Sequence, residues 1–146
     1  MSISEEREYL FVYGSLQRGA SHPAHRILSA FADYICKAEF HGHLFLVEDY
    51  PGAVSACGDA SRIRGELYLL SDAQKAFERL DRYEGYDAFD PDNSLYVRKK
   101  ESVWVASSEY VNPVTAWIYL YNRSTDGLTE IRSGDYLSYI RQQDLC

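Results

Sequence analysis

The sequence predicts a single α+β domain in which a mixed sheet or small β-barrel packs against a few helices. Segments with strand character outnumber segments with helix character, and the two do not alternate regularly along the chain, as they would in a doubly wound fold. The length of 146 residues suits one ordinary domain. Hydrophobic residues make up 46% and charged residues 25% of the chain, a balance typical of soluble globular proteins. We therefore expect residues 1–146 to form one domain.

The first half of the chain is predicted to be mainly β-structure. The run Tyr9–Tyr13 indicates a strand buried on both faces, because it is apolar throughout. A turn flanked by Gly14 and Gly19 follows it. The next expected elements, in chain order, are a short helix that starts near Pro23, strands over residues 34–40 and 43–47, and a turn over residues 50–52.

The second half of the chain is predicted to alternate less regularly between strands and helices. Residues 62–70 alternate between apolar and polar side chains, as in a strand. Glu66 lies opposite the apolar face and is expected to be exposed or paired with an arginine. The clearest helix follows, with Ser71 and Gln74 as a capping box and Gly85 as its C-terminal stop. The remaining expected elements are strands over residues 95–105 and 115–121, and a last helix over residues 134–142 that Ser133 caps.

The charge of the chain bears on its partners and its location. Fifteen basic and 22 acidic residues leave a net charge of −7, so neither nucleic acid nor an anionic membrane surface is expected as a partner. No apolar run approaches the roughly 20 residues that a membrane-spanning helix needs. The N-terminus has neither a basic start nor the apolar core of a signal peptide. These features favour a cytoplasmic protein.

Cysteines and histidines give no pattern that predicts a disulfide framework or a metal site. Cys36, Cys57 and Cys146 form an odd set without CxxC spacing. His41 and His43 share one strand face, but no carboxylate or cysteine at a suitable spacing completes a ligand set. We therefore expect no metal, and a solvated strand face around the two histidines.

Glu84 is a carboxylate at an unusual position of the predicted helix. It lies seven residues after Phe77 and four after Leu80, and both spacings place it on the buried stripe. It also lies in the last turn, where the helix dipole disfavours an anion, and Asp81 adds like-charge repulsion. All three effects raise the pKa of Glu84 towards the range useful for a general base. From the residues alone, a frayed helix end with Glu84 in water remains the alternative.

Two motifs far apart in the sequence form a specific pair. The segment Tyr13-Gly14-Ser15-Leu16 follows the first predicted strand, and Leu80-Asp81-Arg82-Tyr83-Glu84-Gly85-Tyr86 spans the end of the predicted helix. Together they resemble the gamma-glutamylcyclotransferase-like superfamily. Further segments match this superfamily in the same order: Tyr50-Pro51, Gly65-Glu66-Leu67-Tyr68, Tyr96-Val97-Arg98, Trp117-Ile118-Tyr119 and Ser133-Gly134-Asp135-Tyr136.

The resemblance covers nearly the whole chain and indicates the short, single-domain branch of the superfamily. One position departs from the pattern: Gly52 follows Pro51, where many relatives place alanine. In the family this turn borders the pocket, so the departure bears on substrate preference.

The resemblance implies a compact, mostly antiparallel β-barrel with flanking helices, and an enzyme that needs no cofactor or metal. The implied reaction converts a γ-glutamyl amine or γ-glutamyl amino acid to 5-oxoproline and a free amine, an intramolecular acyl transfer of the lyase type. By position, Glu84 is the implied general acid/base and Tyr119 a pocket residue, with Tyr121 the less certain choice. The implied substrate-binding loop consists of Tyr13, Gly14, Ser15 and Leu16.

The implied role of Glu84 agrees with the pKa expected from its position. A carboxylate with a raised pKa can take a proton from the α-ammonium of the substrate, which frees the amine to attack its own γ-carbonyl. The backbone N–H groups of Gly14, Ser15 and Leu16 can bind the substrate carboxylate or the developing oxyanion. The alternative is a non-catalytic module on the same fold that binds a small ligand without converting it.

Overall fold

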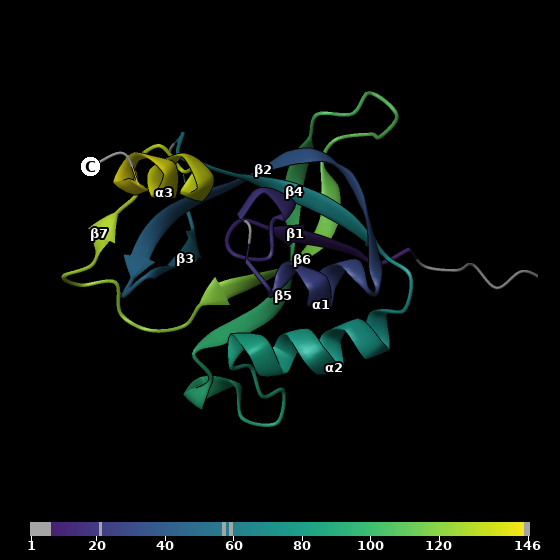
Figure 1. The fold of residues 1–146 in the computed structure, drawn as a ribbon, viewed down its shortest axis with the longest axis horizontal. Coiled ribbons are helices and arrows are strands. Elements are labelled where there is room, and N and C mark those ends of the chain that lie inside the picture. Colours follow the sequence, from purple (N-terminus) through teal and green to yellow (C-terminus); the bar gives the residue numbers. More distant parts are fainter. Residues whose placement is uncertain (1–6, 21, 57, 59, 145–146) are drawn as a thin grey trace, which may run out of the picture.

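The fold is a five-stranded β-barrel with helices packed outside it (Figure 1). The computed structural model describes residues 7–20, 22–56, 58 and 60–144. Its strands are β1 (Tyr9–Val12), β2 (Ala32–Val47), β3 (Tyr50–Ser55), β4 (Arg62–Leu70), β5 (Tyr96–Val105), β6 (Val114–Tyr121) and β7 (Thr129–Glu130). Its helices are α1 (His25–Ser29), α2 (Ala73–Glu84) and α3 (Tyr136–Asp144), with 3₁₀ turns at Arg18–Ala20 and Pro91–Asn93.

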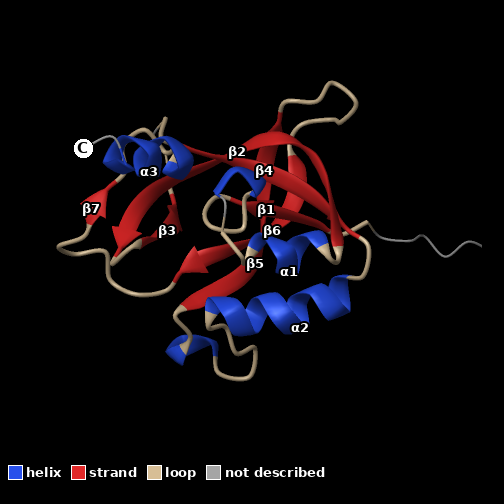
Figure 2. Ribbon diagram, viewed as in Figure 1, coloured by secondary structure: helices blue, strands red, loops and turns tan. Residues whose placement is uncertain are grey.

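The barrel closes because each of its five strands pairs with two neighbours. The order is β2, β4, β1, β6 and β5, and β5 pairs back to β2. Strands β1 and β6 run parallel, and the other four pairs are antiparallel. Helices α1 and α2 lie together along one side, while α3 lies near β3 and β7 on the other (Figure 2). The predicted α+β class and the mostly antiparallel barrel are confirmed.

One long strand, β2, replaces two predicted strands. It runs unbroken through Gly42 and continues beyond the barrel to pair with β3 and β7. A Cβ atom at Gly42 would lie 2.5 Å from the carbonyl oxygen of Val54. This glycine therefore marks a close approach of two strands rather than a break. The predicted turn over residues 50–52 is also wrong, because β3 begins there and the chain reverses one step earlier, where Glu48 has a φ of 59°.

Strand β1 lies at the centre of the protein and is buried on both faces, as predicted. Phe11 belongs to the apolar cluster inside the barrel, whereas Leu10 and Val12 belong to the cluster beneath α1 and α2. This division follows from the alternation of side chains along a strand. Burying each large apolar side chain stabilises the fold by about 1.5–3 kcal/mol. The segment after β1 therefore leaves from a rigid point in the core.

Helix α2 ends where the sequence predicts but begins differently. Its N-cap is Asp72, whose side chain accepts a hydrogen bond from the Lys75 N–H at 3.1 Å. Ser71 is not the cap, because its own N–H donates to the carbonyl of Phe31 and holds it in the preceding loop. At the other end Gly85 adopts a left-handed φ of 70°, which confirms the predicted stop.

Helix α3 also starts later than predicted. Its first turn is capped by Asp135, whose carboxylate accepts from the N–H and the hydroxyl of Ser138. The Ser133 hydroxyl instead accepts from the Asp135 N–H, so it positions the capping residue. An aspartate is as good an N-cap as a serine, and the neighbouring candidates cannot be separated by residue type alone.

Two findings concern the thiols and the helix lengths. Cys36 carries a free thiol, while Cys57 and Cys146 lie outside the described residues. None of the described helices has the length and apolarity that crossing a membrane requires.

Gly134 and Gly127 provide a matched test of how the loop before α3 packs against β4. Both have positive φ, 69° and 80°, so alanine at either position costs about 1–2 kcal/mol of backbone strain. A Cβ at Gly134 would also overlap the carbonyl oxygen of Arg62, whereas one at Gly127 meets open space. We expect Gly134→Ala to lower the free energy of unfolding by at least about 2 kcal/mol more than Gly127→Ala, measured by urea denaturation. Equal losses of unfolding free energy in the two variants would contradict the close contact between Gly134, in the loop before α3, and Arg62 of β4.

Candidate active site

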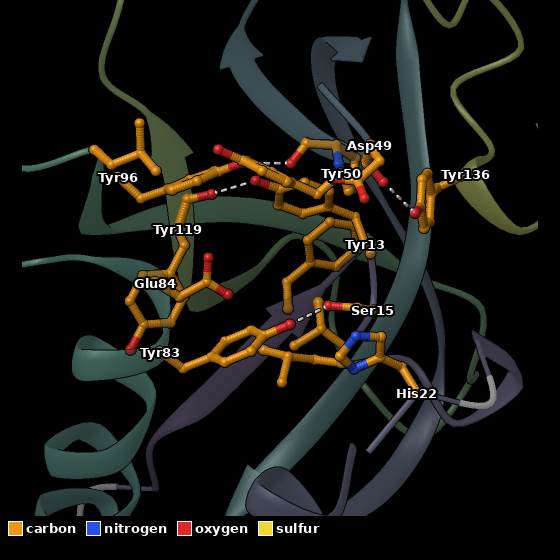
Figure 3. Close-up of a pocket in the computed structure, with 16 residues that line it drawn as sticks. Tyr13, Ser15, His22, Asp49, Tyr50, Tyr83, Glu84, Tyr96, Tyr119 and Tyr136 are labelled. Atoms are coloured by element: carbon orange, nitrogen blue, oxygen red, sulfur yellow. Dashed lines mark hydrogen bonds between the residues drawn. The ribbon is translucent and has the colours of Figure 1, made fainter. Parts of the chain in front are cut away.

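The predicted site residues line one cavity of about 450 Å³ (Figure 3). The segment after β1, the last turn of α2, the start of β3 and the late strand β6 form its walls. Seven of its 16 lining residues are phenylalanine or tyrosine, and its size lies in the range of small-molecule sites. The residues singled out from the sequence that line it are Tyr13, Gly14, Ser15, Leu16, Glu84 and Tyr119.

The loop after β1 is a tight turn packed against β3. The N–H of Gln17 donates to the carbonyl of Gly14 at 3.0 Å, which closes the turn. A Cβ at Gly14 would lie 2.6 Å from Cγ of Pro51, so this position needs glycine for close packing. Ser15 Oγ and the Tyr83 hydroxyl are hydrogen-bonded at 2.6 Å, which ties the loop to the end of α2. Loop and helix end therefore hold each other beside the cavity.

A buried carboxylate holds the chain just after this loop. Glu66 is 1% exposed, and its Oε1 accepts from the backbone N–H of Arg18 and from the hydroxyl of Tyr68. The Arg18 guanidinium lies 3.5 Å from its other oxygen. Of the two alternatives expected for Glu66, exposure or pairing with an arginine, the structure shows the second. A ring nitrogen of His25 meets the carbonyl of Leu16 at 2.8 Å and anchors the loop from α1.

Glu84 is the last residue of α2, and its carboxyl group points into the cavity (Figure 3). Burial, and then the negative charge of Asp81, raise the pKa of Glu84 to about 8. Gly85 closes the helix directly after it, so the helix end is not frayed, and the Glu84 side chain is half-buried. A carboxyl group with this pKa changes its protonation state close to neutral pH, as a general acid/base must.

Asp81 has a different environment, although it lies on the same face of α2. Its carboxylate accepts hydrogen bonds from Arg98 Nε at 2.8 Å and Nη2 at 3.1 Å, and from the Tyr119 hydroxyl at 2.6 Å. The Arg98 guanidinium in turn lies over the rings of Phe77 and Trp117, 3.8 and 4.6 Å from their centroids. Asp81 does not line the cavity. Of the two carboxyl groups at the end of α2, only that of Glu84 lines the cavity.

The roles of Asp81 and Arg98 were not predicted from the sequence, although both residues lie in motifs that match the superfamily. The available signal was the cross-strand pair of Arg98 with Tyr119, which a correct alignment of β5 with β6 would have brought together. Tyr121, the less certain candidate, does not line the cavity. Its side chain packs behind Gly52, where an added Cβ would lie 2.9 Å from the Tyr121 Cβ. Packing therefore explains why alanine is not accommodated at Gly52.

Three tyrosines of the cavity wall bond to the protein through their hydroxyl groups. Tyr13 donates to the carbonyl of Tyr119 at 2.6 Å and accepts from the N–H of Ala53, and Tyr96 donates to the carbonyl of Pro51 at 2.6 Å. The Tyr119 hydroxyl donates to the carboxylate of Asp81. Burial raises the pKa of all three phenols, so they remain neutral. They therefore present rings rather than donors to a ligand.

Several polar groups of the cavity wall remain for a ligand. The carboxyl group of Glu84 is one, and the side chains of His22, Asp49 and Tyr50 also line the cavity. The backbone of the loop is another, because within the described part of the chain the N–H groups of Ser15 and Leu16 donate to no backbone or side-chain acceptor. The described residues contain no group of three or more histidine, cysteine, aspartate or glutamate side chains arranged to hold a metal ion.

Comparison with known proteins agrees with the resemblance seen in the sequence. The family model for gamma-glutamyl cyclotransferase, AIG2-like proteins matches residues 10–138. The chain belongs to this family. A relative in Methanocaldococcus jannaschii, MJ1514, provisionally named a gamma-glutamylcyclotransferase, is 33% identical over 138 residues, which cover 90% of this chain and 98% of the relative. The gamma-glutamylcyclotransferase family protein YtfP of Escherichia coli K12 is 30% identical over 137 residues, which cover 88% and 95% of the two chains.

Solved structures show that the gamma-glutamyl cyclotransferase, AIG2-like fold is shared. YkqA of Bacillus subtilis superposes with a TM-score of 0.70 at 23% identity, over 96% of this chain and 43% of that protein. A mouse AIG2-like protein superposes with a TM-score of 0.62 at 21% identity, over 81% and 80% of the two chains. At these identities the likeness concerns the barrel and its helices, while the site is argued from the residues of this chain.

Replacing Asp81 tests whether its ion pair holds the end of α2. The Asp81 and Arg98 side chains are 20% and 15% exposed, so Asp81→Asn leaves a largely buried guanidinium without its counter-charge. We expect a loss of about 3 kcal/mol in the free energy of unfolding, measured by urea denaturation. The control is Glu39→Gln, since Glu39 is 44% exposed and lies 3.8 and 4.0 Å from its two arginine partners; it should lose less than about 1 kcal/mol. Similar losses in both variants would show that Asp81 is only a surface partner.

Proposed function

We propose that this chain is a cyclotransferase that converts a γ-glutamyl amine or γ-glutamyl amino acid to 5-oxoproline and a free amine, with Glu84 as the general acid/base. Membership of the gamma-glutamyl cyclotransferase, AIG2-like family supports the reaction class. The observation that carries the proposal is the Glu84 carboxyl group in the cavity, with a pKa of about 8 and the glycine loop in the same wall. A carboxylate placed only for solubility would not be held in such a position.

The ring-forming step needs a base because the α-amine of the substrate is an ammonium ion near neutral pH. Ionised Glu84 takes one proton from this ammonium. The freed nitrogen attacks the γ-carbonyl carbon, a new C–N bond closes the five-membered ring, and the bond to the leaving nitrogen breaks. Glu84 returns this proton to the leaving nitrogen and carries a second proton from the attacking nitrogen to the same group, so the lactam keeps one N–H and the amine departs as an ammonium ion. No water is consumed, and the proton transfers leave the enzyme in its starting state.

The cavity contributes mainly by holding the substrate in its folded-back conformer. Both reacting groups belong to one molecule, so restricting its rotations supplies a large effective concentration. The aromatic walls exclude water and favour this compact form. The N–H groups of Ser15 and Leu16 are suited to the α-carboxylate of the substrate or to the oxyanion that forms on the γ-carbonyl. Tyr13 and Tyr119 supply the apolar surface behind them.

The proposal is tested by amine release from a panel of γ-glutamyl compounds as a function of pH. Protonated Glu84 cannot accept a proton, so kcat/KM should rise with pH through a midpoint near pH 8 and level off above it. Glu84→Gln keeps the shape of the side chain and should lower turnover by about 10²–10⁴-fold. Calorimetric binding of 5-oxoproline should survive, because the loop and the tyrosine rings are unchanged.

The matched control is Glu78→Gln, which makes the same chemical change on an exposed position of α2 and should leave turnover within about twofold of the unchanged protein. Turnover of Glu84→Gln within a few-fold of the unchanged protein would place the base elsewhere. Binding of 5-oxoproline without release of amine from any compound of the panel would instead identify a ligand-binding module.

A further inference from the structure

A second cavity of about 510 Å³ lies behind the loop that lines the candidate active site. Strands β2, β4 and β5 and the start of α3 form its walls, together with Gln17. It is as large as the first cavity and shares no lining residue with it. A hollow of this size is in the range of small-molecule sites.

The charges around this second cavity differ from those of the protein as a whole. The chain has a net charge of −7, yet Lys37, Arg64 and Arg141 all line the cavity. Its two acidic side chains have partners of their own. Glu39 lies within 4.0 Å of Arg64, and Asp135 caps α3. Within the described residues, no acidic side chain lies at ion-pair distance from Lys37 or Arg141. Two cations are therefore left to attract an anion.

The rest of the wall is apolar and aromatic. Ala38, Val105 and Leu137 line it, and each is nearly fully buried. Trp104 also lines it and is 36% exposed. One face of its ring stacks on His41, with the ring centroids 4.0 Å apart and the planes 8° from parallel, which holds the indole in place. A ligand with a ring or an alkyl part would bury apolar surface here.

In residues 16–17 and 135–137, successive side chains line the two cavities in alternation. Leu16 and Tyr136 face the candidate active site, while Gln17, Asp135 and Leu137 face the second cavity. The wall between the cavities is therefore as thin as one loop and one helical turn. A ligand that moves Gln17 must also affect the loop, because the Gln17 side chain and N–H both contact the carbonyl of Gly14, at 3.4 and 3.0 Å.

We propose that the second cavity binds a small organic anion, a carboxylate or phosphate joined to an aromatic or apolar group, and that its occupancy is transmitted to the loop Gly14–Leu16. The cations of Lys37 and Arg141 would bind the anionic head, and Trp104 with the apolar wall would bind the remainder. Binding itself does not depend on the proposed cyclotransferase activity.

The chain contains two tryptophans, and they make the test internally controlled. Trp104 lines the second cavity and Trp117 does not. In ¹H–¹⁵N correlation spectra of the full chain, phenyl phosphate or benzoate should shift the indole signal of Trp104 and the amide signals of Gly14–Leu16, and leave the indole of Trp117 in place. The two probes distinguish a phosphate from a carboxylate head.

Two further probes separate charge from apolar contact. Benzyl alcohol carries the ring without charge, and inorganic phosphate carries charge without the ring. Both should bind at least about tenfold more weakly than the better aromatic anion. Equal binding of benzyl alcohol would overturn the assignment to an anion. No shift of the Trp104 indole with any probe would overturn the site.

Variants of Lys37 and Arg141 test whether these two cations bind the anion. Arg141→Gln or Lys37→Gln should each lower the affinity for the aromatic anion by about tenfold. Lys99→Gln removes the same charge from an exposed position of β5 outside the cavity and should leave affinity unchanged. An equal loss of affinity in all three variants would show that only the net charge of the protein matters, and would overturn the assignment to Lys37 and Arg141. Movement of the Trp104 indole without any change at Gly14–Leu16 would contradict the transmission to the loop.

Discussion

The site depends on the carboxylate of Asp81, which Arg98 and Tyr119 hold with three hydrogen bonds of 2.6–3.1 Å. These bonds fix the last turn of α2 to strands β5 and β6. A residue three positions further along a helix lies on nearly the same face. Fixing Asp81 therefore aims Glu84 into the cavity, beside the loop that leaves β1. Because β1 is buried on both faces, that loop also starts from a rigid position.

The same arrangement gives two neighbouring carboxyl groups opposite properties. Asp81 is bound by a guanidinium and a phenol and serves the structure. Glu84 lacks a cationic partner among the described residues, and burial together with the charge of Asp81 raises its pKa to about 8. Separating two titratable groups by their surroundings is a common way to divide structural and acid/base roles. The Tyr13 and Tyr96 hydroxyls donate to backbone carbonyls, and the rings of both residues line the same cavity as Glu84.

Local patterns predicted what depends on local physics. The apolar run of β1, the helix stop at Gly85 and the half-buried position of Glu84 follow from side-chain periodicity and backbone freedom. Gly42 misled the prediction, because a glycine that breaks a strand and one that permits close strand packing look the same in sequence. The contacts of Asp81 with Arg98 and Tyr119 join residues 17 and 38 positions apart, so they depend on strand register rather than on local sequence. The second cavity is less predictable still, since its walls come from five separate segments.

The most direct measurement is the ionisation of Glu84 itself, followed by ¹³C NMR of side-chain carboxyl groups, with the Glu84 signal identified by its loss in Glu84→Gln. A midpoint near pH 8 is expected, well above the ordinary value of 4.5. Such a midpoint would show that the folded protein holds this carboxyl group away from water and close to another negative charge. A midpoint near 4.5 would show a solvated carboxylate and would contradict the role of Glu84 as the base of the site.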